Sequence, residues 1–190
     1  MNQFLMLSKW SKPFRAMVVF LFTTLSLLGC STTIDEYKSQ SPTFLPETFF
    51  NGPMTAHGMV KDYRGKVIRT FYADINAYWV DDTGVLDESF IFNDGEKQIR
   101  RWEIQKKGNT YTATASDVIG SSALIVAGNA LTMTYELELE PDGMTVSMED
   151  WIFLIDEHTA LAETQIRKWG LPVGEITLTM RKLLPYSESR

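Results

Sequence analysis

The chain has almost no cysteine and almost no histidine. Its 190 residues contain one cysteine, Cys30, and two histidines, His57 and His158. A disulfide needs two cysteines, and zinc sites need several cysteines or histidines at close spacing. Neither histidine has a second histidine at metal-ligand spacing. The sequence therefore predicts no disulfide and no metal site, and it favours surface positions for both histidines.

Motifs for nucleotide binding and hydrolysis are missing too. The chain has no Gly-x-Ser-x-Gly, no phosphate-binding loop, no Cys-x-x-Cys and no His-Glu-x-x-His. Nothing therefore predicts a bound cofactor. An enzyme is disfavoured, because nothing supports one beyond the presence of carboxylates such as Glu88, Asp117 and Asp150. Two such groups would have to converge in one cleft for acid or base chemistry to work.

Positive charge is also scarce. Lys and Arg total 18 against 24 Asp and Glu, which gives a formal net charge of −6. Non-specific binding to nucleic acid depends on basic residues that neutralise phosphates, so a nucleic-acid partner is disfavoured. Electrostatic attachment to an anionic membrane surface is disfavoured for the same reason.

What the sequence does have is an apolar run near its beginning. Residues 16–30, AMVVFLFTTLSLLGC, follow three basic residues (Lys9, Lys12 and Arg15) and no acidic one. This is the order of a secretory signal peptide. A retained membrane-spanning helix is disfavoured because it needs about 20 predominantly apolar residues. A plain secretory signal is disfavoured because Leu27 occupies a position where such signals have a small residue.

The run ends in Leu27-Leu28-Gly29-Cys30, which resembles the lipobox of bacterial lipoproteins. The resemblance implies cleavage between Gly29 and Cys30 and attachment of fatty-acyl chains such as palmitate to Cys30. One acyl chain holds a protein only marginally, so stable anchoring needs several. By the same resemblance, the non-acidic Ser31 implies sorting to the outer membrane, with the protein facing the periplasm.

Removal of 29 residues leaves a mature chain of 161 residues and formal charge −9, since three basic residues are lost. That length suits one domain. We expect a cleaved signal peptide at 1–29, a lipidated cysteine with a flexible tether at 30–46, a single domain at 47–183 and a polar tail at 184–190. The alternative for the tether is packing against the domain, which Phe44, Phe49 and Phe50 favour for its second half.

From Gly52 onward, turn signals alternate with segments rich in Val, Ile, Thr and aromatic residues. Pairs such as Asp94-Gly95 supply the positive φ that tight hairpins need. Between the turns we expect strands. The ten expected segments are 53–61, 66–78, 85–92, 97–106, 109–117, 122–127, 130–139, 144–155, 160–168 and 173–182.

Several segments alternate apolar and polar residues with a period of two. In 131–139 every odd-numbered residue is apolar and every even-numbered one is polar, and 67–77 and 174–182 follow similar patterns. Such alternation indicates antiparallel strands with one buried face. A long meander usually closes on itself, because closure removes its exposed edges. The prediction is an all-β, up-and-down, lipocalin-like barrel, with a two-sheet sandwich as the alternative.

Residues 159–170 are ambiguous. Thr159 suits a helix N-cap, and Gly170 and Pro172 suit the end of a helix. A strand is preferred, because the segments on either side are expected to pair with it.

Charged and aromatic residues occur together within the expected strands. On the alternation, Glu88 shares a face with Phe90, and Arg100 shares one with Trp102. Burial of a charge is costly unless it is paired. One interpretation is a polar cluster that orients the head group of a ligand inside a cavity. The alternative is a structural ion pair or an outward-facing group. The candidate ligand-binding residues are Glu88, Arg100, Trp102, Asp117, Tyr135 and Trp151.

Four tryptophans remain in the mature chain: Trp79, Trp102, Trp151 and Trp169. Aromatic residues at this density either fill a small barrel or line a pocket. The sequence leaves both outcomes open.

A series of short patterns, taken in order, resembles an uncharacterised bacterial lipoprotein family catalogued as domain of unknown function 3833. The resemblance covers roughly residues 57–182 and implies a lipocalin-like domain on a lipoprotein, without an assigned activity. The patterns are Asp62-x-x-Gly65, Arg69-x-Phe71, Glu88-x-Phe90, Asp94-Gly95, Arg100-x-Trp102, Asp117-Val118-Ile119-Gly120, Gly128-Asn129-Ala130, Asp150-Trp151 and Lys168-x-Gly170-x-x-Val173-Gly174.

The functional expectation is a membrane-anchored lipoprotein that binds or carries a small hydrophobic or lipid-like ligand in the cell envelope. It rests on the anchor, the aromatic-rich barrel and the missing catalytic motifs. The alternative is a structural or interaction lipoprotein with a solid core that docks an envelope partner. The sequence makes no prediction about the oligomeric state.

Overall fold

The computed structural model describes residues 32–139 and 143–183. The chain divides into two compact units, Met1–Thr33 and Ile34–Arg190, and the second unit contains every described helix and strand. The expected signal peptide, the lipid attachment site Cys30 and the polar tail at 184–190 lie outside the described residues. Within the described ranges, no helix is both long and apolar enough to span a membrane.

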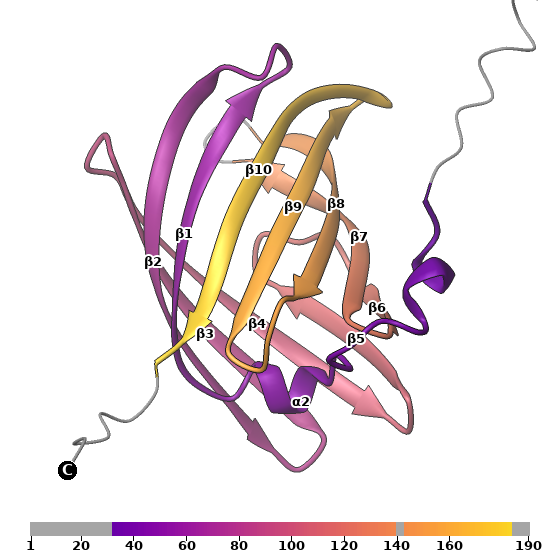
Figure 1. Ribbon diagram of the computed structural model, residues 1–190. Coiled ribbons are helices and arrows are strands. Elements are labelled where there is room, and N and C mark those ends of the chain that lie inside the picture. Colours follow the sequence, from indigo (N-terminus) through magenta and orange to yellow (C-terminus); the bar gives the residue numbers. More distant parts are fainter. Residues whose placement is uncertain (1–31, 140–142, 184–190) are drawn as a thin grey trace, which may run out of the picture. The chain divides into compact units, whose positions relative to one another are not determined.

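The described residues form a ten-stranded antiparallel barrel (Figure 1). Each strand pairs with its neighbours in sequence, and β1 also pairs with β10, which closes the barrel. The predicted closed meander is confirmed, and the open sandwich is excluded. The strands are β1 (Gly52–Asp62), β2 (Val67–Val80), β3 (Thr83–Phe92), β4 (Lys97–Lys107), β5 (Thr110–Ala115), β6 (Ser122–Ala127), β7 (Ala130–Leu139), β8 (Met144–Leu154), β9 (Thr159–Lys168) and β10 (Leu171–Lys182).

The period-two alternation sets which face of each strand points inward. The odd-numbered residues of β7, from Leu131 to Leu139, all face the barrel interior, as their pattern predicts. The ambiguous segment at 159–170 is strand β9 followed by a turn at Trp169 and Gly170. Its buried residues Ala160 and Ala162 alternate with exposed Leu161. Pairing on both sides with β8 and β10 therefore overrides the local helix signals.

The two ends of the barrel differ. One end, which we call the mouth, carries the connections β1–β2, β3–β4, β5–β6, β7–β8 and β9–β10. The other end carries the remaining connections and the segment that precedes β1, with the short helix α2 (Pro46–Phe49) (Figure 1). We call this the plugged end, because the side chains of Phe44, Phe49 and Phe50 are almost entirely buried there.

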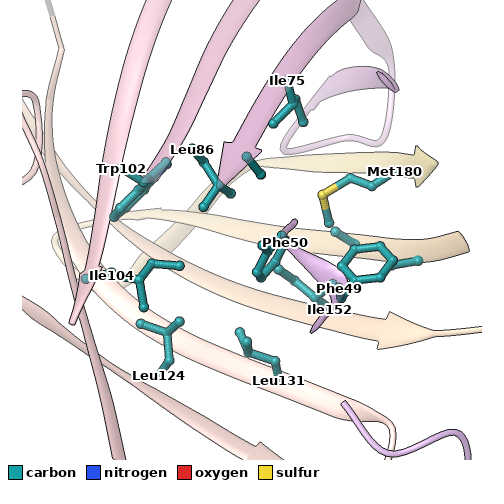
Figure 2. Close-up of a cluster of buried hydrophobic side chains, with 14 of the residues drawn as sticks. Phe49, Phe50, Ile75, Leu86, Trp102, Ile104, Leu124, Leu131, Ile152 and Met180 are labelled. Carbon is teal, nitrogen blue, oxygen red and sulfur yellow. The ribbon is translucent and has the colours of Figure 1, made fainter. Parts of the chain in front are cut away.

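The plug is an aromatic cluster that is also tied to the wall by polar contacts. Phe44, Phe49 and Phe50 contact one another with ring centroids 5.3 to 5.7 Å apart. In Figure 2, Phe49 and Phe50 lie among buried side chains from strands all around the barrel. Glu47 of α2 accepts hydrogen bonds from Lys106 Nζ at 2.6 Å and from the Tyr111 hydroxyl at 2.8 Å. The apolar contacts and these bonds together close this end of the barrel.

The residues before the plug lie against the outside of the barrel. The 3-10 helix η2 (Ile34–Tyr37) contacts β6 and β7, and the Tyr37 ring packs on Trp151 and Phe153 with centroids 5.9 and 5.2 Å away. For residues 34–46 the structure therefore shows the packed alternative and not a free tether.

Gly128 lies where this packed segment approaches the turn between β6 and β7. Its amide oxygen accepts a hydrogen bond from Phe44 N at 2.7 Å. Its φ is +53°, and a Cβ at this position would lie 1.7 Å from the Tyr37 carbonyl oxygen. Only glycine fits both the backbone conformation and the close approach.

Candidate functional site

The barrel contains a cavity of about 680 Å³. This volume lies within the range of small-molecule binding sites, roughly 300–1,000 Å³. The cavity runs from Phe50 at the plugged end to Glu96, Ile99 and Glu138 at the strand ends around the mouth. The protein is therefore a cup with its opening at the mouth.

The wall near the plug is apolar. Leu86, Ile104, Leu124, Leu131 and Ile152 all line the cavity there and are buried. These side chains come from β3, β4, β6, β7 and β8, and Figure 2 shows them gathered in the barrel interior. A hydrocarbon group in this part of the cavity would contact apolar atoms on all sides, which is favourable because it removes apolar surface from water.

A cluster of polar side chains lies further toward the mouth. We call it the polar cluster. It is formed by inward-facing residues of β3, β4, β7, β8 and β9 and by the loop after β5, so residues far apart in sequence meet across the barrel. Its members are Glu88, Arg100, Asp117, Tyr135, Asp150 and Thr164.

Arg100 and Asp117 form the ion pair of the cluster. Arg100 Nε and Nη2 both donate to Asp117 Oδ2, at 2.9 and 2.6 Å. Asp117 is placed by the loop after β5, whose backbone bonds to β7: Glu138 N donates to the Asp117 carbonyl oxygen at 2.9 Å. Burial alone would lower the pKa of Arg100, but the charges of Asp117 and Glu88 outweigh it and raise that pKa. The guanidinium is therefore always charged.

Asp150 on β8 also lines the cavity and is 9% exposed. Burial raises the pKa of its carboxyl to about 6, although hydrogen bonds from the Thr164 and Tyr135 side chains favour the ionised form. Burial, and then the charge of Asp150, raise the pKa of the Tyr135 hydroxyl well above its usual value. Tyr135 is therefore a permanent donor near neutral pH.

Glu88 is the most strongly perturbed acid of the cluster. Burial raises its pKa to about 7, opposed by Arg100 and reinforced by the negative charges of Asp150 and Asp117. Its side chain is partly exposed because it lines the cavity. Near neutral pH this carboxyl is thus divided between its neutral and ionised forms.

The cluster leaves acceptor atoms without partners. Among the described residues, neither Asp117 Oδ1 nor Asp150 Oδ1 has a hydrogen-bond partner, and both atoms are buried. Unpaired buried polar atoms are uncommon in native proteins, because each costs about 1–3 kcal/mol. The cluster contains three carboxyl groups but only one guanidinium. Its hydrogen-bond acceptors therefore outnumber the donors that a positive charge supplies. The cluster thus has more hydrogen-bond acceptors than the surrounding donors of the described residues satisfy.

The structure brings together five of the six candidate residues from the sequence. Glu88, Arg100, Trp102, Asp117 and Tyr135 all line the cavity, and the Trp102 and Tyr135 rings meet edge to face with centroids 5.3 Å apart.

Trp151 is the exception, because it lies on the outer face of β8 against Tyr37. Its neighbour Asp150 takes the inward position, in step with buried Met148 and Ile152. The alternation of Met148, Asp150 and Ile152 along β8 was the sequence signal that could have placed Asp150 inside. Thr164 was missed, and its parity with buried Ala160 and Ala162 on β9 would have placed it inside.

A second polar group borders the mouth. Arg69 lies over the Phe92 ring at 3.6 Å and donates to Asp94 at 2.7 and 2.9 Å and to Glu96 at 2.6 Å. These contacts fix the β3–β4 turn, where Gly95 has a φ of +88°. Arg69 is thus fully engaged by its acidic neighbours at the rim.

Neither histidine belongs to the polar cluster. His57 is exposed on β1 beside Tyr72, and His158 lies in the turn between β8 and β9 at the plugged end. In the part of the chain that the structure describes, no group of three or more His, Cys, Asp or Glu side chains is arranged to hold a metal ion.

The family model of DUF3833, described as a protein of unknown function, matches residues 24–182. The chain belongs to this family. The match confirms the family resemblance seen in the sequence patterns. No relative was found among curated proteins.

Among solved structures, this DUF3833 protein is similar to the S-type phycobiliprotein lyase CPES from Guillardia theta. The TM-score is 0.50 with 9% sequence identity, over 72% of this chain and 89% of that chain. Two further matches are EF1p2_mFAP2b bound to DFHBI (TM-score 0.39, 10% identity, 74% and 100% covered) and the redesigned barrel mFAP0 bound to DFHBI (0.38, 12%, 70% and 99%). At such low identity, the likeness to the lyase shows the barrel fold alone.

Proposed function

We propose that this DUF3833 protein is a lipid-anchored protein of the cell envelope whose barrel binds a small hydrophobic or amphiphilic ligand. The observation that carries the proposal is the cavity of about 680 Å³, whose mostly apolar wall holds one polar cluster between the plug and the mouth. An amphiphile suits this arrangement, because its chain would contact the apolar wall and its head group would reach the polar cluster. Ligand sites are typically apolar pockets with a few convergent polar groups.

The anchor in the proposal rests on the sequence. The basic residues, the apolar run and the Leu-Leu-Gly-Cys motif ending at Cys30 are typical of a lipoprotein signal. Attachment of acyl chains at Cys30 would hold the barrel at a membrane, and sorting to the outer membrane would place it in the periplasm. A Cys30→Ala variant should lose metabolically incorporated palmitate. Its signal peptide should remain uncleaved. Retained palmitate in that variant would contradict the anchor.

The cavity also bears on the alternative of a docking protein with a solid core. That alternative requires a filled barrel, whereas the interior wall here encloses a volume in the ligand-binding range. Ligand binding is therefore the better-supported function.

The test of ligand binding uses residues 31–190, secreted with a cleavable signal. This fragment keeps the whole compact unit that begins at Ile34, and circular dichroism would verify its cooperative unfolding. Native mass spectrometry should find an added mass that organic extraction removes. A clean apo mass, even after incubation with envelope lipids, would contradict the proposal.

Two substitutions on β9 make matched controls. Ala162 is buried and lines the cavity, so Ala162→Phe should reduce its volume and abolish the added mass. Leu161 is 43% exposed on the outer face, so Leu161→Phe should retain that mass. Equal loss in both variants would show that the ligand is not in the cavity.

A further inference from the structure

The polar cluster has a composition that selects among amphiphiles. Its one cation, Arg100, already donates two hydrogen bonds to Asp117 Oδ2. A ligand carboxylate or phosphate would have to compete with Asp117 for this guanidinium. It would also approach the carboxyl groups of Glu88 and Asp150, and like charges at short range inside a protein repel strongly. The cluster is therefore a poor site for an anionic head group.

The same cluster offers unoccupied acceptors. Asp150 is more than nine-tenths buried and lines the cavity, and its Oδ1 has no partner among the described residues. Asp117 Oδ1 is likewise buried and unpaired within that part of the chain. Glu88 is a third carboxyl group on the cavity wall, and it is close enough to Asp150 and Asp117 for their charges to raise its pKa. A cationic donor near these carboxyl groups would offset part of the cost of burying their negative charge.

We propose that the ligand is an amphiphile whose head group carries a positive charge and donates hydrogen bonds, as a primary ammonium does. Its nitrogen would lie among the carboxyl groups of Asp150, Asp117 and Glu88, all three of which line the cavity. Its chain would lie against the apolar wall toward the plug. This inference rests on the proposed function, since it names the class of ligand that the same cavity takes.

Because several charged or titratable groups face Glu88, binding of a cation should change the number of protons that the cluster holds. From the surrounding elements these are Arg100 on β4, Asp117 in the loop after β5, Tyr135 on β7 and Asp150 on β8. The pKa of Glu88 is about 7 and that of Asp150 about 6, so both carboxyl groups are largely protonated at pH 5. A cation favours their ionised forms. Its binding should therefore release protons near pH 6.5 and strengthen from pH 5 to pH 8.

The experiment compares three probes with one chain length, namely decylamine, decanol and decanoate, below their micellar concentrations. Isothermal titration calorimetry on residues 31–190 at pH 7.5 should rank decylamine first and decanoate last. Repetition at pH 6.5 in two buffers of different ionisation enthalpy should reveal proton release for decylamine alone. Decanoate binding as tightly as decylamine would overturn the inference and leave the proposed function standing. Failure of all three probes to bind would overturn both.

Single substitutions test which carboxyl groups of the polar cluster bind the head group. Asp150→Asn should weaken decylamine at least about ten-fold, the loss expected for one charged hydrogen bond, while decanol changes less than about three-fold. Glu88→Gln should reduce the proton release, and it provides a second test if Asp150→Asn does not fold. Asp74→Asn, on the outer face of β2, is the matched control and should bind decylamine unchanged. Unchanged decylamine binding in both cavity variants would refute the assignment.

Discussion

The raised pKa of Glu88 has a measurable effect on the stability of the barrel. An acid with a pKa of about 7 in the folded state and 4.5 as its ordinary value binds its proton more tightly when folded. Between these values, the folded state carries more protons than the unfolded state. The free energy of unfolding therefore falls as pH rises through this window and levels off above it.

The magnitude follows from the size of the pKa shift. Each pKa unit corresponds to 1.36 kcal/mol, so a shift of roughly 2.5 units costs up to about 3 kcal/mol once the carboxyl is fully ionised. Glu88→Gln mimics the protonated carboxyl and removes this loss. Relative to wild type, the variant should have nearly equal stability at pH 4.5 and should gain up to about 3 kcal/mol at pH 8.

Urea unfolding at pH 4.5, 5.5, 6.5 and 8, followed by far-ultraviolet circular dichroism, measures this difference directly. Glu163→Gln, at an exposed position on β9, is the matched control, and its effect should not vary with pH in the same way. A Glu88→Gln variant that gains nothing between pH 4.5 and 8, or that loses stability at pH 8, would refute the reasoning.

Three other substitutions test the plug, the packed N-terminal segment and the ion pair. Gly128→Ala should destabilise the fold by more than about 1 kcal/mol and expose residues 34–46 to protease, whereas Gly108→Ala, also at positive φ but facing open space, should leave that segment protected. Phe44→Ala should cost about 3–5 kcal/mol in urea unfolding because Phe44 is fully buried, and a loss no greater than that of the half-exposed Leu45→Ala would contradict the plug. Arg100→Met should destabilise the barrel by about 3–5 kcal/mol at pH 7.5 by leaving buried carboxylates unpaired. The loss should shrink at pH 4.5, where Glu88 and Asp150 are protonated, and the outward-facing Arg101→Met should show no such pH dependence.

The strands could be predicted because their signals are local. Period-two alternation and glycine turns located all ten strands. Closure of the barrel, which the structure achieves by pairing β1 with β10, was predicted only from the general tendency of a long meander to remove its exposed edges. Alternation also placed Glu88 on the face of Phe90 and Arg100 on the face of Trp102, and the structure shows that these side chains line the cavity. Alternation was applied less fully to β8, where Trp151 was taken as inward although Asp150 shares the parity of Met148 and Ile152.

The cavity could not be predicted in the same way. Whether Trp102 and Tyr135 fill the barrel or border a hollow depends on how side chains from opposite walls meet, which alternation along one strand does not encode. The unpaired oxygens of Asp117 and Asp150 likewise depend on contacts across the barrel. The plug was partly foreseeable, because Phe44, Phe49 and Phe50 are large apolar residues just before the first strand.

The even number of strands has a practical consequence for handling this protein. An antiparallel barrel of ten strands returns the chain to the end at which it entered, and Leu183 N donates to the Pro53 carbonyl oxygen at 2.9 Å. The last described residue thus lies at the plugged end, away from the mouth. A fluorophore, affinity tag or sensor surface joined after Leu183 leaves the opening unobstructed, whereas one inserted in the 63–66 turn would stand at the entrance.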